Sequence, residues 1–344
     1  MSVLRLDPHD AGNAARWDAF VQACPTATFF HRAGWQSVLR EAIGHDTHFL
    51  YCEIDGRIEG VLPLAHVRSM LFGHSLVSLP FAVYGGVAAT SPAASAALED
   101  EAQALAKRLG VAHLELRNVQ ARNADWPAQD LYVTFRKAIL PDVEANMLAI
   151  PRKQRAMVRK GIKAGLRGEI DADVERFFPL YADNMHRHGS PAMAKRYFEA
   201  LLRAFGDDAQ VLTIVSAEGR AVSGVLSFYF RDEVLPYYAG DIADARELAA
   251  NDFKYWDLMH RACERGLRTF DYGRSKQGSG SYSFKKNWGF EPQPLHYEFC
   301  LYKRDAVPQN NPNNGKFRLA IEGWRRMPRA MATFIGPYVV RGLG

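Results

Sequence analysis

The chain has 344 residues, which exceeds what one compact core usually supports and suits two domains. Hydrophobic residues make up 48% and charged residues 24%, which is typical of a globular protein and excludes a disordered or fibrous chain. The formal net charge of +5 is too small to indicate nucleic-acid binding by itself. The distribution of the charges therefore matters more than their sum.

The cysteines do not form a pattern that binds metal. None of the four stands in a CxxC pair, and no histidine cluster accompanies them; they are Cys24, Cys52, Cys263 and Cys300. We therefore expect no metal site and no disulfide framework, but buried thiols in a reducing compartment. The polar first residues lack the apolar core of a signal peptide, and no window reaches the roughly 18 apolar residues of a membrane span. These features predict a cytoplasmic protein.

Helix-like and strand-like segments alternate along the chain. In the first part, helical spacing is found at 16–24, 32–43 and 94–109, and strand-like runs lie at 49–54, 58–67, 75–84, 113–117 and 132–139. In the second part, helices are predicted at 177–185, 193–205 and 251–265, and strands at 210–216, 221–230, 234–239, 269–273 and 295–302. Turn glycines between strands predict a hairpin in each part.

The order of the elements repeats. Gly56 and Gly219 mark the two hairpin turns, a shift of 219 − 56 = 163 residues, and Gly110 and Gly266 end the corresponding helices, a shift of 266 − 110 = 156. Such a shift far exceeds the period of solenoid repeats, so it predicts two copies of a whole domain. Each copy runs helix, hairpin, strand, helix, strand, helix or loop, strand.

That order is typical of the acyl-CoA N-acyltransferase (GNAT) fold. We therefore predict an α/β (α+β) protein with two tandem GNAT-like domains, each a mixed central sheet flanked by helices. The predicted divisions are 1–145, 146–305 with the probable active site, and a linker and basic amphipathic tail at 306–344.

Two segments concentrate positive charge. At 152–167, helical spacing places Arg152, Arg155, Arg159 and Lys163 on one continuous face. This face could hold tRNA backbone, nucleotide-sugar phosphates or an anionic lipid headgroup, or it could be the solvated face of an interdomain helix. The tail at 316–344 could lie on an anionic membrane surface or dock back on the domains.

The segment 270–290 is the strongest candidate for chemistry. It reads F-D-Y-G-R-S-K-Q-G-S-G-S-Y-S-F-K-K-N-W-G-F: a strand end, a glycine-rich loop and a short helical piece. Backbone N–H groups of such a loop can face an anion, and the planar fork of Arg274 can grip a phosphate or carboxylate. The alternative is a flexible, solvated loop with a basic edge.

This run resembles FemAB-family transferases, in particular the FemAB-like proteins associated with exosortase/PEP-CTERM systems. Further pieces that resemble them are T-F-F-H-R-A-G-W, S-L-P-F-A-V-Y-G-G, I-P-R-K-Q-R-A-M-V-R-K-G, L-P-Y-Y-A-G and N-D-F-K-Y-W-D-L-M. The resemblance implies a transferase that moves an acyl or aminoacyl group to an amine or hydroxyl of a peptidoglycan, other cell-envelope or exopolysaccharide precursor. The donor would be aminoacyl-tRNA or acyl-CoA, with no tightly bound cofactor.

Site residues follow from the resemblance and from the chemistry. The resemblance places Lys285 at the reaction centre, where an ammonium group stabilises the tetrahedral oxyanion of acyl transfer. Candidate bases are Asp271, Tyr272 and Tyr282, although Asp271 could equally cap the next turn. Substrate contacts are predicted for Arg274, Ser275, Lys276, Tyr238, Asn251, Trp288, Arg152, Lys153, Arg155 and Lys160.

One expected motif is absent. Ordinary acetyl-CoA N-acyltransferases carry a Q/R-x-x-G-x-G/A loop after the central strand, but 240–251 reads G-D-I-A-D-A-R-E-L-A-A-N. The absence favours a different activated donor. Two alternatives stay open: a conventional acetyl-CoA-dependent N-acetyltransferase, and a non-catalytic binder of an anionic glycan precursor or RNA.

Overall fold

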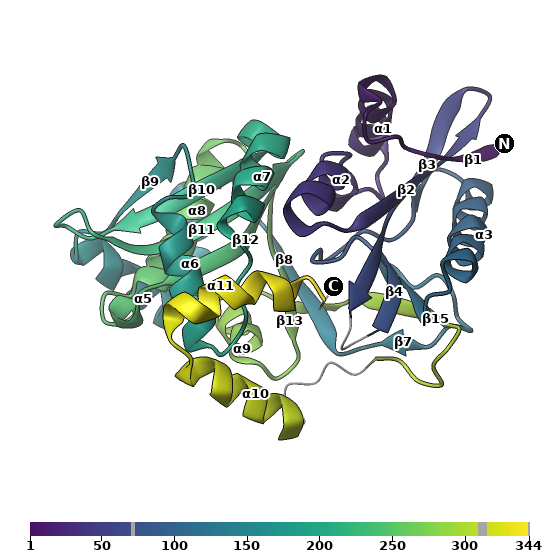
Figure 1. The fold of residues 1–344 in the computed structure, drawn as a ribbon. Coiled ribbons are helices and arrows are strands. Elements are labelled where there is room, and N and C mark those ends of the chain that lie inside the picture. Colours follow the sequence, from purple (N-terminus) through teal and green to yellow (C-terminus); the bar gives the residue numbers. More distant parts are fainter. Residues whose placement is uncertain (70–72, 309–314, 343–344) are drawn as a thin grey trace. The chain divides into compact units, whose positions relative to one another are not determined.

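The computed structural model describes residues 1–69, 73–308 and 315–342, and the side chains of 315–318 are not described. The chain divides into two compact units, each built around one sheet (Figure 1). Unit 1 comprises Met1–Asp130, Leu295–Asn310 and Tyr338–Gly344, and unit 2 comprises Leu131–Pro294 and Asn311–Pro337.

The sheet of unit 1 is antiparallel except at one pair of strands. Its order is β1 (Ser2–Arg5), β2 (Asp46–Ile54), β3 (Arg57–Ser69), β4 (Gly73–Ser78), β6 (His113–Asn118), β15 (His296–Leu301) and β7 (Ala128–Gln129), with β5 (Ala88–Ala89) paired to β3. Strands β4 and β6 run parallel. The helical segments are α1 (Ala11–Ala23), η1 (Phe29–His31), α2 (Trp35–Ser37), η2 (Val38–Ile43) and α3 (Pro92–Leu109).

The sheet of unit 2 repeats this pattern. Its order is β9 (Arg167–Asp171), β10 (Ala209–Val215), β11 (Ala221–Phe230), β12 (Glu233–Asp241), β13 (Thr269–Lys276), β8 (Tyr132–Ala138) and β14 (Pro292–Pro294), and β12 and β13 are the parallel pair. The helices are α4 (Val143–Ala149), α5 (Arg152–Lys163), α6 (Phe177–Arg187), α7 (Lys195–Phe205), α8 (Ala250–Glu264), α9 (Gly280–Asn287), α10 (Gly315–Arg326) and α11 (Arg329–Val340), with the short turns η3 (Gly206–Asp208) and η4 (Ala243–Arg246).

Helices cover both faces of the sheet in unit 2. Gly224 lies against Phe177 and Leu180 of α6, and a side chain at Gly240 would collide with the α6 backbone. The next residue, Val225, points to the opposite face because side chains alternate along a strand. There it joins the core cluster that contains much of α8. Each face of this sheet is therefore buried by a different helix.

The two units have the same strand order, which confirms the predicted duplication. Gly56 and Gly219 occupy the two hairpin turns with positive φ, as their spacing predicts. Each sheet, however, takes its sixth strand from the other half of the sequence: β8 pairs with β13, and β15 pairs with β6. The units therefore differ from the predicted division at 145 and 305, which assigns β8 to the first domain and β15 to the second.

Several elements differ locally from the predictions. The helix predicted at 32–43 is a short α2 that continues as a π-helical turn. The run at 75–84 is a strand only to Ser78, and the edge strands β1 and β9 were not predicted. The strand predicted to end at Gly273 continues to Lys276, because β8 provides a pairing partner for its last residues.

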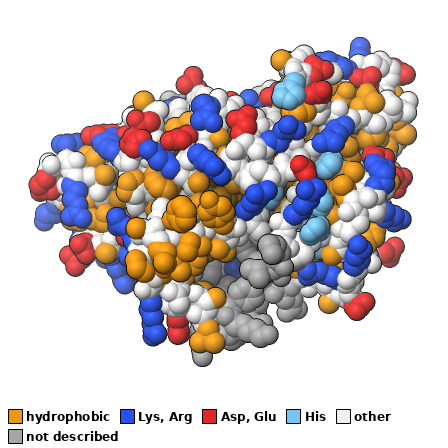
Figure 2. Space-filling view, viewed as in Figure 1, with side chains coloured by type: hydrophobic (Ala, Val, Ile, Leu, Met, Phe, Trp, Pro, Cys, Tyr) orange, Lys and Arg blue, Asp and Glu red, His pale blue; other side chains and the backbone are white. Residues whose placement is uncertain are grey.

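The tail forms two helices that dock on unit 2. The Arg329 guanidinium pairs with Asp183 at 3.1 Å, and the ring of His186 contacts the Met327 carbonyl at 2.9 Å. Gly189 lies against Ile321 of α10. Of the predicted linker at 308–315, residues 309–314 lie outside the described residues, as does the Phe317 side chain. Hydrophobic side chains gather on the surface over α11 (Figure 2).

Candidate functional site

The sheet of unit 2 opens between its two parallel strands. Strands β12 and β13 pair at Glu233–Thr269 and Val234–Phe270, and no further pair follows in the described chain. Beyond that point β12 remains paired with β11 and β13 remains paired with β8, and each of these pairings contains a register shift. The carboxyl ends of separating parallel strands are where open sheets usually bind ligands. This opening is therefore the candidate functional site.

Helix α8 begins beside the end of β12. No side chain of the described residues caps its N-terminus, and Ala249 before it adopts a left-handed conformation with φ 55°. The N–H groups of an uncapped first turn, together with the helix dipole, favour an anionic ligand. Asn251, predicted to bind substrate, lies in this first turn.

A buried ion pair ties β12 to α8. The Lys254 ammonium is fully buried and lies 2.8 Å from the Asp241 carboxylate. Burial lowers the pKa of Lys254, but the Asp241 carboxylate together with the nearby Tyr255 and Asp252 outweighs that effect, so the pKa is raised. Ser223 of β11 also donates to Asp241. The start of α8 is therefore fixed against the end of the central strand.

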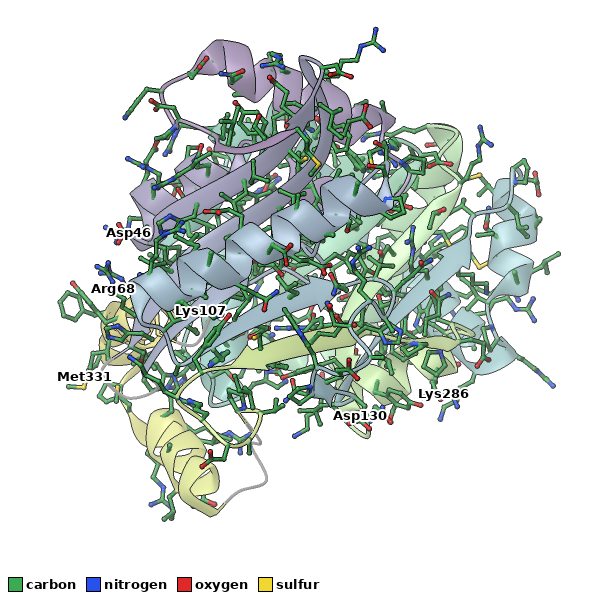
Figure 3. The ribbon with its side chains drawn as sticks, turned by 90° about the vertical axis from the view of Figure 1, so that its right-hand side faces the viewer. Asp46, Arg68, Lys107, Asp130, Lys286 and Met331 are labelled. Carbon is green, nitrogen blue, oxygen red and sulfur yellow. The ribbon has the colours of Figure 1, made fainter. Side chains whose placement is uncertain are left out.

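Lys285 of α9 is buried at the bulge in β13. Its Nζ donates to the carbonyls of Tyr272 at 2.7 Å, Gly273 at 3.0 Å and Arg274 at 3.0 Å. Burial lowers its pKa to about 7, and the nearby Asp271 carboxylate opposes that shift. Three carbonyl acceptors favour the charged form, because a neutral amine has two hydrogens to donate. The neighbouring Lys286 is exposed (Figure 3).

Asp271 is fully buried, and its carboxylate stabilises the bulge in β13. Its Oδ1 accepts from the Gly273 N–H at 2.7 Å, and its Oδ2 lies 3.5 Å from Nε of Arg136. This arrangement is the turn cap that the sequence left open as an alternative to catalysis. Tyr282 is half-buried on α9, and its ring meets Phe135 edge-on at 5.4 Å.

Aromatic and acidic groups line the α8 side of the bulge. The Tyr272 ring lies 4.8 Å from Tyr255 of α8, and its buried hydroxyl has no hydrogen-bond partner among the described residues. Trp288, predicted to bind substrate, is fully buried and donates to the Asp252 carboxylate at 3.0 Å. Burial raises the pKa of Asp252, and it raises the pKa of Tyr272 well above 10.

The residues after the bulge have different environments. The Arg274 guanidinium lies over the Tyr132 ring at 4.7 Å. Ser275 is 3% exposed, and its hydroxyl has no partner in the described part of the chain. Lys276 is half-buried at the strand end. Of these three predicted residues, Arg274 contacts Lys285 through its carbonyl, and Ser275 and Lys276 follow it on β13.

Tyr238 lies on the opposite face of the sheet. Its hydroxyl is 2.8 Å from that of Tyr197, and its ring packs edge-on against Tyr181 and Phe198 of α6 and α7. Burial raises its pKa well above 10. The structure therefore does not bring Tyr238 to the same side as Lys285.

Helix α5 carries the predicted cationic face. Val158 and Gly161 are buried, and a side chain at Gly161 would collide with Phe253 of α8. Its cations have no carboxylate partner among residues 1–69, 73–308 and 315–342; they are Arg152, Lys153, Arg155, Arg159, Lys160 and Lys163. The Arg155 guanidinium donates to the Leu148 carbonyl at 3.2 Å. The rest of the face is available to an anion.

Sequence and structure comparisons agree with this architecture. Residues 152–286 match the family model described as an acetyltransferase (GNAT) domain. The crystal structure of FemX is similar with a TM-score of 0.68 at 16% identity, covering 88% of this chain and 98% of that one. The fold is that of two tandem GNAT-like domains.

Two further solved structures share this tandem GNAT-like fold. The C-terminal domain of a putative lysylphosphatidylglycerol synthetase from Agrobacterium fabrum has a TM-score of 0.59 at 12% identity, covering 94% of this chain and 96% of that one. A tandem GNAT protein from the clavulanic acid biosynthesis pathway has a TM-score of 0.55 at 13% identity, covering 90% and 99%. Comparison with curated protein sequences gives no match.

Neither a cluster of metal ligands nor a membrane-spanning helix is found among the described residues. They hold no group of three or more His, Cys, Asp or Glu side chains arranged to bind a metal ion. None of the helices described combines the length and the apolar character that crossing a bilayer requires.

Sequence reasoning missed several residues of this site. Lys254 and Asp241 are thirteen residues apart, on either side of a loop, and although Lys254 stands in the piece N-D-F-K-Y-W-D-L-M, no role was predicted for either residue. Asp252 was taken as part of a core helix, because its contact with Trp288 depends on how α9 folds back. A buried lysine in an otherwise apolar helical stripe is the signal that could have indicated the ion pair.

Proposed function

We propose that unit 2 transfers an activated acyl or aminoacyl group at the opening between β12 and β13. The observation that carries the proposal is the parallel strand pair that separates after Val234 and Phe270, within the segment that matches a GNAT domain. Separated strands present backbone N–H and C=O groups to which an extended donor arm can bind. The uncapped first turn of α8 offers N–H groups to the donor's phosphates.

The chemistry places negative charge near the bulge. An acceptor amine or hydroxyl attacks the donor carbonyl carbon, and the leaving thiol or ribose oxygen takes up the proton that the nucleophile loses. The tetrahedral oxyanion formed on the way is stabilised by a fixed cation in a dry site. Lys285 supplies that cation, at the cost of releasing one of its three carbonyls. The buried Tyr272 hydroxyl is better placed than Asp271 for proton transfer, because it has no hydrogen-bond partner among the described residues whereas Asp271 is engaged by Gly273.

For the acceptor we propose an anionic cell-envelope or exopolysaccharide precursor, as in FemAB-type transferases of the exosortase-linked branch. The unpaired cations of α5, together with Arg274 and Lys276, suit phosphate groups of that precursor or the backbone of an aminoacyl-tRNA donor. The lysylphosphatidylglycerol synthetase among the similar structures has an aminoacylated lipid in its name. A cytoplasmic enzyme at the inner face of the membrane fits this role.

Exposed apolar side chains on the tail helices support contact with a membrane surface. Leu319 is 69% exposed, Met331 50% and Phe334 72%, with Arg325, Arg326 and Arg329 close by in the sequence. Basic and apolar groups on one helical surface are typical of interfacial binding to anionic lipid. A lipid-linked acceptor would then be presented close to unit 2.

Turnover by the full chain tests the proposal. The protein is incubated with a panel of acyl-CoA thioesters or charged tRNA and with extracted envelope precursors, and acceptor mass is measured. We expect a mass increase that Lys285→Met abolishes and that the exposed neighbour variant Lys286→Met preserves. Binding of precursors without any mass increase, across both donor classes, would instead favour the non-catalytic binder.

A further inference from the structure

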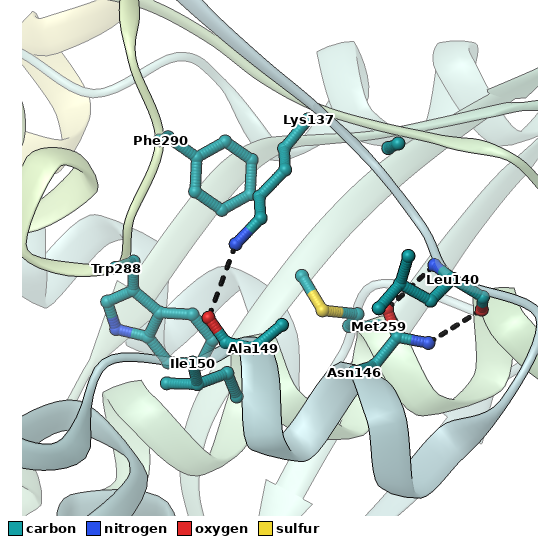
Figure 4. A pocket seen from close by; sticks show the side chains of 9 residues that line it. Lys137, Leu140, Asn146, Ala149, Ile150, Met259, Trp288 and Phe290 are labelled. Atoms are coloured by element: carbon teal, nitrogen blue, oxygen red, sulfur yellow. Dashed lines mark hydrogen bonds between the residues drawn. The ribbon is translucent and has the colours of Figure 1, made fainter.

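A pocket of about 200 Å³ lies in unit 2 (Figure 4). Its floor is made by the buried side chains of Met259, Trp288 and Phe290, and its mouth by Lys137, Leu140 and Ala149. Met259 is nine residues after Ala250, the first residue of α8, so it lies about 14 Å along the helix from its N-terminus. The pocket shares Trp288 with the site described above, through the hydrogen bond to Asp252, and its other lining residues have no part in the proposed transfer.

The walls of the pocket are apolar, and one polar wall group is already satisfied. Asn146 donates from Nδ2 to the carbonyls of Leu140 at 2.7 Å and Asp142 at 2.9 Å, and its Oδ1 accepts from the Leu140 N–H at 2.9 Å. Its amide braces the turn between β8 and α4 and has little capacity left for a ligand. The interior therefore suits an apolar body.

Lys137 is the polar group at the mouth that lacks a strong partner. Its Nζ lies 3.5 Å from the Ala149 carbonyl and 5.6 Å from the centre of the Phe290 ring. It makes no ion pair within the described residues, and burial lowers its pKa. A half-buried ammonium with one long hydrogen bond gains most from a carboxylate, which forms a short, charge-assisted bond.

Neighbouring charges add to the positive potential at the mouth. Helix α5 begins directly after Pro151, and Pro151 packs close to Gly289 beside Lys137. Its N-terminus has no side-chain cap, and Arg152, Lys153 and Arg155 lie in its first turn. Both the dipole of α5 and these cations favour an anionic head group over a neutral or cationic one.

We propose that this pocket binds a monocarboxylate whose apolar body is the size of a phenyl ring or a short alkyl chain. The carboxylate meets the Lys137 ammonium, and the apolar body lies against Met259, Trp288 and Phe290. The size follows from the volume, since an apolar cavity of about 150 Å³ holds benzene. This site is additional to the transfer site, and binding of a carboxylate there does not depend on transfer activity.

The test uses the full chain with its methionines labelled by ¹³C in the methyl group. The Met259 signal is assigned with Met259→Leu, and 3-phenylpropionate is titrated against the neutral 3-phenyl-1-propanol. We expect saturable shifts of Met259, with the acid binding about tenfold more tightly than the alcohol. Equal affinities, or a Met259 signal that neither compound moves, would overturn the proposal.

Two variants locate the head group. Lys137→Met should remove the preference for acid over alcohol while leaving alcohol binding intact, which also shows that the pocket is still folded. The matched control Lys107→Met makes the same charge change on the exposed surface of α3 in unit 1 and should leave the preference unchanged. A preference that survives Lys137→Met would show that another cation binds the carboxylate and would refute the assignment.

Discussion

The two units share a strand order but differ in the chain segment that follows their pair of parallel strands. In unit 1 the chain after β4 folds back and covers the end of β6 at 79–87. The Arg117 N–H donates to Ser78 Oγ at 2.7 Å, and the Gly86 N–H donates to the Arg117 carbonyl at 3.0 Å. Tyr84 in this segment is 1% exposed. The backbone that a donor would need is therefore already bound by the protein itself.

In unit 2 the connection at 242–249 leads from β12 directly to α8, and the cation of Lys285 binds the strand. Unit 1 has a buried cation as well, but the Arg117 guanidinium binds the covering segment, through the Ala82 carbonyl at 2.8 Å. The comparison teaches that the duplication kept the sheet in both units, while a covering segment follows the parallel strand pair in unit 1 and a helix follows it in unit 2. The family match at 152–286 falls in that unit.

The largest effect is expected from the buried ion pair that unit 2 alone places between its central strand and helix. The corresponding helix of unit 1, α3, buries Ala, Ser and Leu side chains, whereas α8 buries Lys254 against Asp241. Lys254→Met leaves Asp241 without its partner and should lower the unfolding free energy of unit 2 by about 3–5 kcal/mol. Hydrogen exchange by mass spectrometry should show faster exchange in β11, β12 and α8 and unchanged exchange in β2 and β3. Equal loss of protection in both units would contradict this assignment.

A pair of substitutions separates the roles of the two cations. Lys285→Met and Arg117→Met each leave buried carbonyls without a donor, so each should destabilise its unit by about 1–3 kcal/mol. Transfer should fall by about 10²–10³ with Lys285→Met, because one charge-stabilising donor is lost. Arg117→Met should leave the turnover of folded protein unchanged. Steady-state rates, corrected for folded fraction by circular dichroism, decide between these outcomes, and a loss of turnover in Arg117→Met would place unit 1 in the chemistry.

As pH falls, unit 1 should lose stability at a higher pH than unit 2. Burial lowers the pKa of His45 and of His48 to about 4, so both rings stay neutral in the folded state while the unfolded chain binds protons below pH 6.5. Stability is therefore lost as pH falls from 6.5 towards 4, by about 2 kcal/mol for each ring at pH 5. Hydrogen exchange at pH 7 and pH 5 should show the loss in β2 and β3. The double variant His45→Leu and His48→Leu should flatten this dependence, and an unchanged slope would exclude these rings as its cause.

Much of the fold could be predicted from the sequence because its signals are local. The hairpins are marked by turn glycines at 56 and 219 with alternating apolar residues on either side. Within each hairpin these residues lie only a few positions apart in the sequence. The exchange of β8 and β15 could not be found this way, because pairing between His296 and Asn118 depends on contacts far apart in the chain. The run at 75–84 was misread for a related reason: Leu79, Ala82 and Tyr84 are apolar because they fill the strand gap, and a buried loop has the composition of a strand.

The sequence predicted where the candidate site lies better than it predicted the geometry of the site. The run at 270–290 indicated a cation near a strand end, and Lys285 is indeed buried there. The Lys285 ammonium donates to three successive carbonyls because β13 has a bulge there. The bulge in turn depends on the pairing of β13 with β8. Tyr238 was expected in the same cleft, yet the register of β12 turns it to the other face, since one residue's displacement changes the side of a strand.

The smallest effect concerns the cationic face of α5, which has no counterpart on α3 of unit 1. Lys153 and Lys160 are exposed and make no ion pair in the described chain, so removing either charge should change stability by less than about 0.5 kcal/mol. If these cations hold an anionic acceptor or donor, Lys153→Gln with Lys160→Gln should raise KM several-fold with kcat unchanged, because binding that is equal in ground and transition states affects KM alone. The effect should shrink with rising salt, since exposed charges are screened. Lys107→Gln on the basic end of α3 is the matched control, and an equal rise in KM there would show that overall charge, not the α5 face, attracts the substrate.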